Sequence, residues 1–150
     1  MEVRDELGAH VKTVAMIGVT VIITLVAYLA VVEVVRAAFK PFRGFAATSH
    51  TRELRFAFYG AAILAVLVIR FLRQFFLRRP AGGGGPAGVH RLERASLVTM
   101  ILSEIPGLLG LTLFLLFGLN IDFYILLFVS FFLVFMYFPR RPSWEEWLKG

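Results

Sequence analysis

Long apolar runs dominate the chain, and the polar residues gather between them. Four runs are long and apolar enough to cross a membrane as helices, at residues 13–32, 56–77, 96–118 and 123–138. A bilayer core about 30 Å thick requires about 20 residues of helix. Apolar and polar positions do not alternate within the runs, which excludes the strands of a membrane barrel. The pattern therefore predicts an all-α membrane protein with four transmembrane helices.

A glycine- and proline-rich segment at residues 78–94 divides the four spans into two pairs. Its sequence, RRPAGGGGPAGVHRLER, has four consecutive glycines between two prolines, a composition typical of a flexible linker. We therefore predict a first transmembrane hairpin at residues 1–77 and a second at residues 95–150, joined by this linker. The two halves show no persuasive internal repeat.

The second span is long enough to cross only if it includes Arg70 and Arg73. These arginines are three positions apart, so they share one face of a helix. Their charged ends are expected to reach the headgroups while their methylene stems lie in lipid.

Composition agrees with a membrane protein and suggests its orientation. The 150 residues are 59% hydrophobic and 17% charged, with a mean hydropathy of +0.79, far from the values of soluble domains. A net charge of +6 would favour nucleic acid in a soluble protein, but the 16 basic residues gather at the ends of the spans and between them. We therefore predict the lipid bilayer as a partner and no nucleic acid. Basic residues are most abundant on the side of the termini and linker, which predicts a multi-pass protein of the cell inner membrane with both termini cytoplasmic.

Two segments that combine aromatic and basic residues are expected at the membrane surface. In the first loop, phenylalanine recurs at every third position between basic residues, as Phe39, Phe42 and Phe45. This loop is either an interfacial segment or an ordinary loop with scattered aromatics. In the C-terminal tail, Trp144 and Trp147 follow two arginines, a pattern typical of an interfacial anchor.

The third span contains the main candidate for a functional residue, Glu104. A carboxylate inside hydrocarbon is costly, so an acid in a span is a functional candidate by default. Pro106 removes a backbone donor and should bend the helix just after the acid. Gly107 and Gly110 allow a neighbouring helix to approach closely. The sequence thus predicts a carboxyl group near mid-bilayer at a kinked and closely packed point.

Three interpretations of Glu104 remain open. The acid carries a proton or an ion, or it pairs with Arg70 of the second span, which lies at a similar depth. In the third interpretation it hydrogen-bonds across an interface to a partner protein without any transport. Intramembrane acids often pair or sit at packed interfaces.

The segment Ser-Glu104-Ile-Pro106-Gly107-Leu-Leu-Gly110-Leu resembles the ion-carrying helix of the rotary ATPase proteolipid (c) subunits. In that family a mid-membrane carboxylate is followed closely by small residues and a Gly-Leu pair, so the resemblance implies an ion-carrying role for Glu104. The four-span arrangement with one acid also resembles the duplicated vacuolar-type proteolipids. The first span departs from the family because it lacks the run of small residues that lines such rings. The C-terminal end also resembles that of uncharacterised bacterial four-span membrane proteins, which implies no activity.

Signatures of enzymes are absent from the sequence. His10, His50 and His90 fall in predicted loops or tails, with His50 on the opposite side, which argues against a histidine metal site or haem ligation. The GGGGP segment lacks the residues of a phosphate-binding loop, and Ser103 has no histidine at its depth to act as a base. The chain has no cysteine. We therefore predict no enzymatic activity, no metal and no bound cofactor.

These features predict a non-enzymatic integral membrane protein, a small accessory or structural subunit of a larger membrane complex. Its contacts with other subunits, or with copies of itself, would use the small-residue faces of the first and third spans. The alternative is a proteolipid-like carrier of protons or ions that uses Glu104, and the next alternative is a small oligomeric exporter. At the turn before the fourth span, Asn120 and Asp122 are expected to cap the helix.

Overall fold

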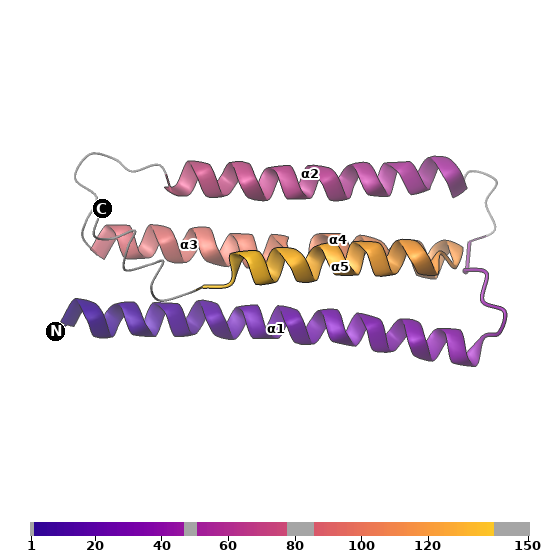
Figure 1. Ribbon diagram of the computed structural model, residues 1–150, viewed down its shortest axis with the longest axis horizontal. Helices are drawn as coiled ribbons and strands as arrows, with labels where there is room; N and C mark the ends of the chain where they lie inside the picture. The colour runs from indigo at the N-terminus through magenta and orange to yellow at the C-terminus, as the bar shows by residue number, and fades with distance from the viewer. Residues whose placement is uncertain (1, 47–50, 78–85, 140–150) are drawn as a thin grey trace.

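The computed structural model of the chain is a bundle of antiparallel and parallel helices (Figure 1). Its backbone is described for residues 2–46, 51–77 and 86–139, and its side chains for residues 8–46, 51–75 and 90–139. The described residues form five helices: α1 (Glu2–Ala38), α2 (Thr51–Leu77), α3 (Pro86–Leu102), α4 (Ile105–Phe117) and α5 (Asn120–Tyr137).

The described helices provide four segments long and apolar enough to cross a membrane, with α3 and α4 together forming the third. The spans are Gly8–Ala38, Thr51–Phe75, His90–Phe117 and Asn120–Tyr137. The predicted all-α fold with four helices long and apolar enough to span a membrane is therefore confirmed, and the length and composition of these helices are those of an integral membrane protein. The helix of the third span begins at Pro86, inside the segment predicted as a linker, because proline suits the first turn of a helix.

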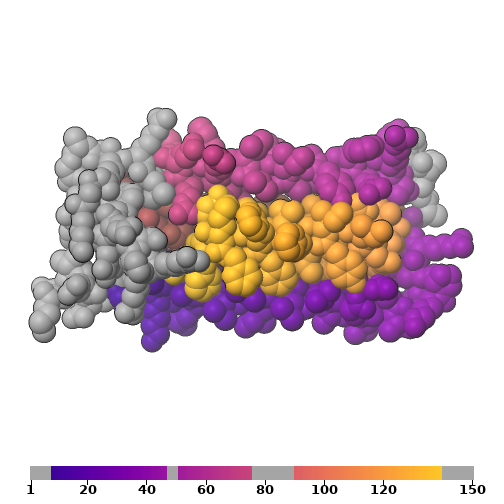
Figure 2. Space-filling view, in the orientation of Figure 1, coloured from indigo at the N-terminus to yellow at the C-terminus, as the bar shows by residue number. Residues whose placement is uncertain are grey.

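The four spans alternate in direction along the chain, but α1 and α2 do not lie side by side. They lie on opposite sides of the layer formed by α3, α4 and α5 (Figure 1). In Figure 2, α5 is visible between α1 and α2. The connection between α4 and α5 is very short, so these helices pack closely against each other. The longer connection after α1 lets the chain cross the end of the bundle before α2 begins.

The core lies where α1 meets α3, α4 and α5. One stripe of α1 is buried: Val11, Val14, Val21, Leu25 and Val32. Successive positions are three, four or seven residues apart, the spacing of a helix that packs along one narrow seam. The stripe contacts buried residues of the other helices, including Met100, Phe114 and Phe123. The remaining apolar faces of α1 and α2 are largely exposed, as expected for helices that face lipid.

The loop after α1 docks on the end of α4. The backbone N–H groups of Phe45 and Ala46 donate to the carbonyl oxygens of Leu115 and Leu116, at 2.9 and 2.8 Å. The last carbonyl groups of a helix have no partner within that helix, so the loop satisfies two of them. This contact fixes the first loop on the bundle.

The docked loop differs from the predicted interfacial segment, in which all three phenylalanine rings would lie in the headgroups. The ring of Phe42 is half-buried and lies 5.0 Å, between ring centroids, from the buried ring of Phe114 on α4. The rings of Phe39 and Phe45 are exposed. One aromatic residue of the repeat therefore packs on the core, and two remain available to the surroundings.

Candidate functional site

The third span is interrupted at its centre. Helix α3 ends at Leu102 and α4 begins at Ile105, so Ser103 and Glu104 form a turn between the two helices. Pro106, in the first turn of α4, has no N–H to donate to the carbonyl of Leu102. Backbone outside a regular helix is tolerated at membrane depth where protein buries it or where it borders a cavity.

The amide freed by this break has a partner on another helix. The N–H of Gly107 donates to Ser130 Oγ of α5 at 2.7 Å, and both residues are buried. A β-carbon added at Gly107 would lie 2.7 Å from Leu25 Cδ2 of α1 and 3.2 Å from Ser130 Oγ. The break is therefore held by close contacts with α1 and α5.

Glu104 lies at the midpoint of the third span and is half-buried. Its Oε1 accepts a hydrogen bond from the hydroxyl of Tyr28 on α1, at 2.5 Å. Among the residues whose side chains are described, no lysine, arginine or histidine forms an ion pair with this carboxylate. Tyr28 did not figure among the sequence-based candidates, although it continues the buried stripe of α1 between Leu25 and Val32.

The structure does not bring Arg70 and Glu104 together, so the ion pair that was one of the three interpretations of Glu104 is not observed among the described residues. Arg70 is exposed, whereas its neighbour Ile69 is buried against the rest of the bundle. Adjacent residues on a helix point about 100° apart, so a similar depth does not place Arg70 on the inner face of α2. Arg73 is half-buried and lies over the ring of Tyr137, 4.5 Å from its centroid.

Three glycines of the small-residue faces that were predicted to bind a partner are occupied within the chain, whereas Ala27 and Ala30 of α1 are exposed. A β-carbon added at Gly110 would lie 3.0 Å from Leu126 Cβ of α5, and one added at Gly18 of α1 would lie 2.9 Å from the ring of Phe138. With Gly107, these glycines bring α1, α4 and α5 together. The predicted anchors Trp144 and Trp147 lie outside the described residues.

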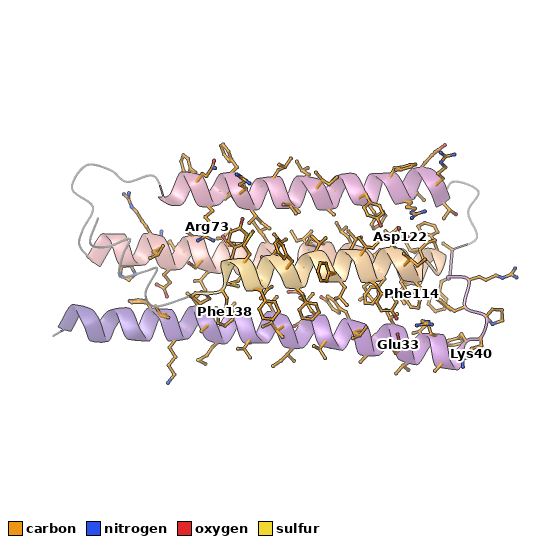
Figure 3. The ribbon with its side chains drawn as sticks, viewed as in Figure 1. Glu33, Lys40, Arg73, Phe114, Asp122 and Phe138 are labelled. Atoms are coloured by element: carbon orange, nitrogen blue, oxygen red, sulfur yellow. The ribbon has the colours of Figure 1, made fainter. Side chains whose placement is uncertain are left out.

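A second polar contact joins α2 to α5 near the end of the bundle that carries the first loop. The side chain of Asp122 is only 3% exposed, and its Oδ1 accepts hydrogen bonds from Arg55 Nε at 2.8 Å and from the hydroxyl of Tyr59 at 2.7 Å. Figure 3 shows Asp122 at the level of Glu33 on the opposite side of α5. Asp122 was expected to cap α5, but its carboxylate links α5 to α2.

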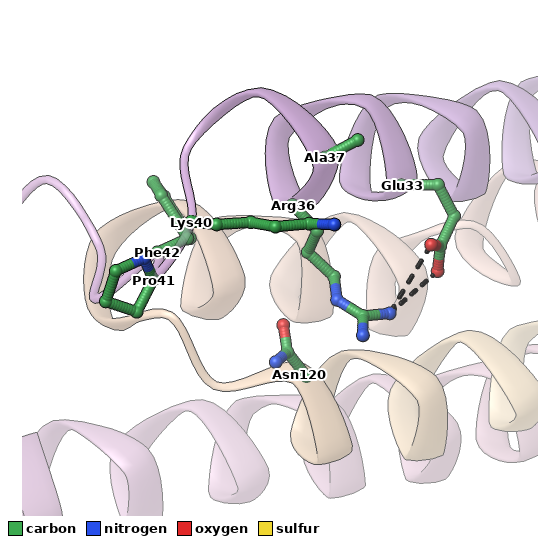
Figure 4. Close-up of a pocket in the computed structure, with 7 residues that line it drawn as sticks. All are labelled: Glu33, Arg36, Ala37, Lys40, Pro41, Phe42 and Asn120. Atoms are coloured by element: carbon green, nitrogen blue, oxygen red, sulfur yellow. Dashed lines mark hydrogen bonds and ion pairs between the residues drawn. The ribbon is translucent and has the colours of Figure 1, made fainter.

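A cavity of about 380 Å³ opens at this same end of the bundle (Figure 4). Its lining residues are Glu33, Arg36, Ala37, Lys40, Pro41, Phe42 and Asn120. Glu33 and Arg36 form an ion pair at 3.0 Å, and the hydroxyl of Tyr124 donates to Glu33. Asn120 Oδ1 is buried without a hydrogen-bond partner in the described part of the chain. The cavity therefore offers cationic groups to an anion and a carboxylate to a donor.

Two of the three histidines lie on helices, which corrects their predicted placement in loops and tails. His10 belongs to α1 and His90 to α3, and their ring centroids are 5.2 Å apart. Glu93 of α3 contacts both rings. The prediction failed for His90 because the linker was extended to residue 94, whereas α3 begins at Pro86, and for His10 because α1 begins at Glu2, well before the predicted span. His50 lies outside the described residues.

Comparison of the chain with protein-family models, with curated proteins and with solved structures finds no match.

Proposed function

We propose that the protein is a small membrane subunit that binds a proton or a monovalent cation at Glu104. The observation that carries this proposal is a half-buried carboxylate at the midpoint of a span, bonded to Tyr28 and without a cationic partner among the described side chains. The resemblance of its segment to the ion-carrying helix of proteolipid subunits supports the same role.

The charge of the Glu104 carboxylate favours a bound proton or cation. An ionised carboxylate that is removed from water without a counter-charge is strongly disfavoured. The hydrogen bond from Tyr28 contributes about 1.5–3 kcal/mol if its acceptor is charged, but it leaves the charge in place. A bound proton or a bound cation neutralises the group, so one of them is expected on Glu104.

The interruption of the third span supports a site at this position. Membrane transporters often bind ions where a span is broken, because carbonyl oxygens freed from helical hydrogen bonds face the ion. Here Pro106 leaves the carbonyl of Leu102 without its helical donor, two residues before Glu104. A carboxylate beside a freed carbonyl provides the oxygen ligands that hard cations prefer.

We place the protein in the inner membrane with both termini in the cytoplasm. The described structure supports a common side for its two ends, because α1 begins and α5 finishes at the same end of the bundle (Figure 1). The distribution of basic residues along the sequence supports the cytoplasm as that side.

Labelling with a hydrophobic carbodiimide tests the site, because this reagent modifies protonated carboxyl groups in apolar surroundings. We expect mass spectrometry of the purified protein to find modification at Glu104, and Glu104→Gln to abolish it. Glu33→Gln is the matched control, because it removes an exposed carboxylate near the end of α1 and should leave the labelling unchanged. Protection by sodium or lithium ions would identify a cation, and its absence a proton. Failure to modify Glu104 at any pH would exclude the proposal.

A second candidate, an accessory subunit of a larger membrane complex, is favoured by the outer face of α2. Ala57, Gly60 and Ala61 are exposed, and no described atom lies within 4 Å of a β-carbon added at Gly60. Small residues at this spacing let another transmembrane helix approach closely. In this candidate the outer face of α2 binds the partner, because neighbouring helices within the chain occupy the glycines of α1 and α4.

Cross-linking from α2 tests this second candidate, and the absence of native cysteine makes single-cysteine variants unambiguous. We expect Gly60→Cys to form a cross-linked product in native membranes, and Met16→Cys, at an exposed position on α1, to form much less. Mass spectrometry would tell a second copy from another subunit. Equal cross-linking of both variants, or elution of the protein alone in mild detergent, would contradict an assembly through α2.

A further inference from the structure

Two histidines and a glutamate meet near the end of the bundle where α1 and α3 begin (Figure 1). His10 Nδ1 lies 2.9 Å from Glu93 Oε2, and His90 Nδ1 lies 3.6 Å from the same oxygen. One nitrogen or oxygen atom from each of the three side chains lies within 4.8 Å of the other two. The cluster lies well away from Glu104, which is at the midpoint of the third span.

The helices hold these side chains in place. His90 and Glu93 are three positions apart on α3, so they share one face of that helix. Their neighbour Leu92 is buried, as is Val11, which follows His10 on α1. Both helices are therefore packed against the bundle at the level of the cluster, and a site built on packed helices keeps its geometry better than one on loops.

We propose that His10, His90 and Glu93 bind a divalent transition-metal ion such as Zn²⁺. Zinc bonds of about 2.0–2.2 Å to nitrogen and oxygen place neighbouring ligand atoms of a tetrahedral site about 3.3–3.5 Å apart. The separations of the two histidine nitrogens from Glu93 Oε2, 2.9 and 3.6 Å, lie on either side of that range, so small rotations of the side chains suffice. Mixed imidazole and carboxylate ligands suit zinc and its first-row neighbours, whereas magnesium and calcium prefer oxygen ligands alone.

The exposure of the three side chains fits a site that solvent can reach. Glu93 and His10 are 18% and 26% exposed, whereas His90 is 64% exposed. A metal could therefore enter beside His90, and water would complete its coordination. The exposed basic residues Arg91 and Arg94 are close in sequence, but solvent and salt screen exposed charges. The site would connect the beginnings of α1 and α3 and stabilise the bundle when metal binds.

Metal titration of the purified protein in detergent tests this inference. The protein carries a purification tag without histidine, and a chelator removes any bound metal before the titration. We expect Co²⁺ to produce the visible absorption of a nitrogen-ligated site and Zn²⁺ to displace it. Zn²⁺ should also raise the melting temperature, whereas Mg²⁺ should not. His10→Gln, His90→Gln and Glu93→Gln should each weaken Zn²⁺ binding by about tenfold or more, and Glu33→Gln should not.

His90→Gln decides the outcome, because this side chain is the most exposed of the three and its loss should leave the fold intact. Its elution from gel filtration provides the check on folding. Zn²⁺ binding that is undetectable, or that is the same in wild type and in His90→Gln, would overturn the inference and leave a hydrogen-bonded cluster of His10 and Glu93. The result is independent of Glu104, whose carbodiimide labelling is measured on the metal-free protein.

Discussion

Replacement of Gly44 by alanine is expected to lower the free energy of unfolding by about 3 kcal/mol or more. Gly44 has a φ of +86°, and an alanine there carries a strain of about 1–2 kcal/mol. The added β-carbon would also lie 2.3 Å from the carbonyl oxygen of Leu116, an atom of the backbone that cannot move aside alone. Displacing the loop would break the hydrogen bonds of Phe45 and Ala46 to the end of α4, at about 1 kcal/mol each.

Unfolding by titration with sodium dodecyl sulfate from mild detergent measures this effect. Gly60→Ala is the matched control, because no described atom lies within 4 Å of the added β-carbon and alanine favours an exposed helix by about 1 kcal/mol. The control should therefore be neutral or slightly stabilising. If Gly44→Ala unfolded like the wild type, the first loop would not be docked on α4.

Docking of the first loop illustrates what the sequence could not provide. Hydropathy and length were enough to predict the four spans, because a helix in lipid satisfies its own backbone and needs no tertiary partner. The loop forms no regular element, and its hydrogen bonds go to Leu115 and Leu116, about seventy residues away in the chain. Nothing in the spacing of its phenylalanines indicates which ring will pack on Phe114.

The sequence likewise indicated the local features of the candidate site but not its contacts with other helices. Pro106 specifies a break in the third span through its own covalent structure, so the break could be expected from the sequence alone. The partner of Glu104 depends on which helix faces it. Matching depths suggested Arg70, but the buried position of Ile69 shows that Arg70 lies on another face of α2. The spacing of the stripe on α1 could have indicated Tyr28 as an inward-facing polar residue.

Polar contacts between spans help to explain the arrangement of the helices. Tyr28 joins α1 to the break in the third span, Asp122 joins α5 to α2, and Glu33 joins α1 to Tyr124 of α5. Hydrogen bonds between transmembrane helices contribute modestly to stability, but they require particular faces to meet. Each hydrogen bond joins α1 or α2 to the third or the fourth span, which consist of α3, α4 and α5. They thus favour the position of α3, α4 and α5 between α1 and α2.

Replacement of Gly107 by valine is expected to lower the free energy of unfolding by about 3 kcal/mol and to expose Glu104. Even a β-carbon would lie 2.7 Å from Leu25 Cδ2 and 3.2 Å from Ser130 Oγ, and two further methyl groups must push α1 and α5 outward. Leu25 is one turn before Tyr28, so movement of α1 should weaken the hydrogen bond to Glu104 and speed its carbodiimide labelling. Gly60→Val adds the same side chain on a face that the rest of the described chain does not contact, so in the purified monomer it should change neither measurement greatly. Equal losses in the two variants would contradict the packing around Gly107 as the cause, because valine has a higher helical propensity than glycine and should not destabilise an exposed position by itself.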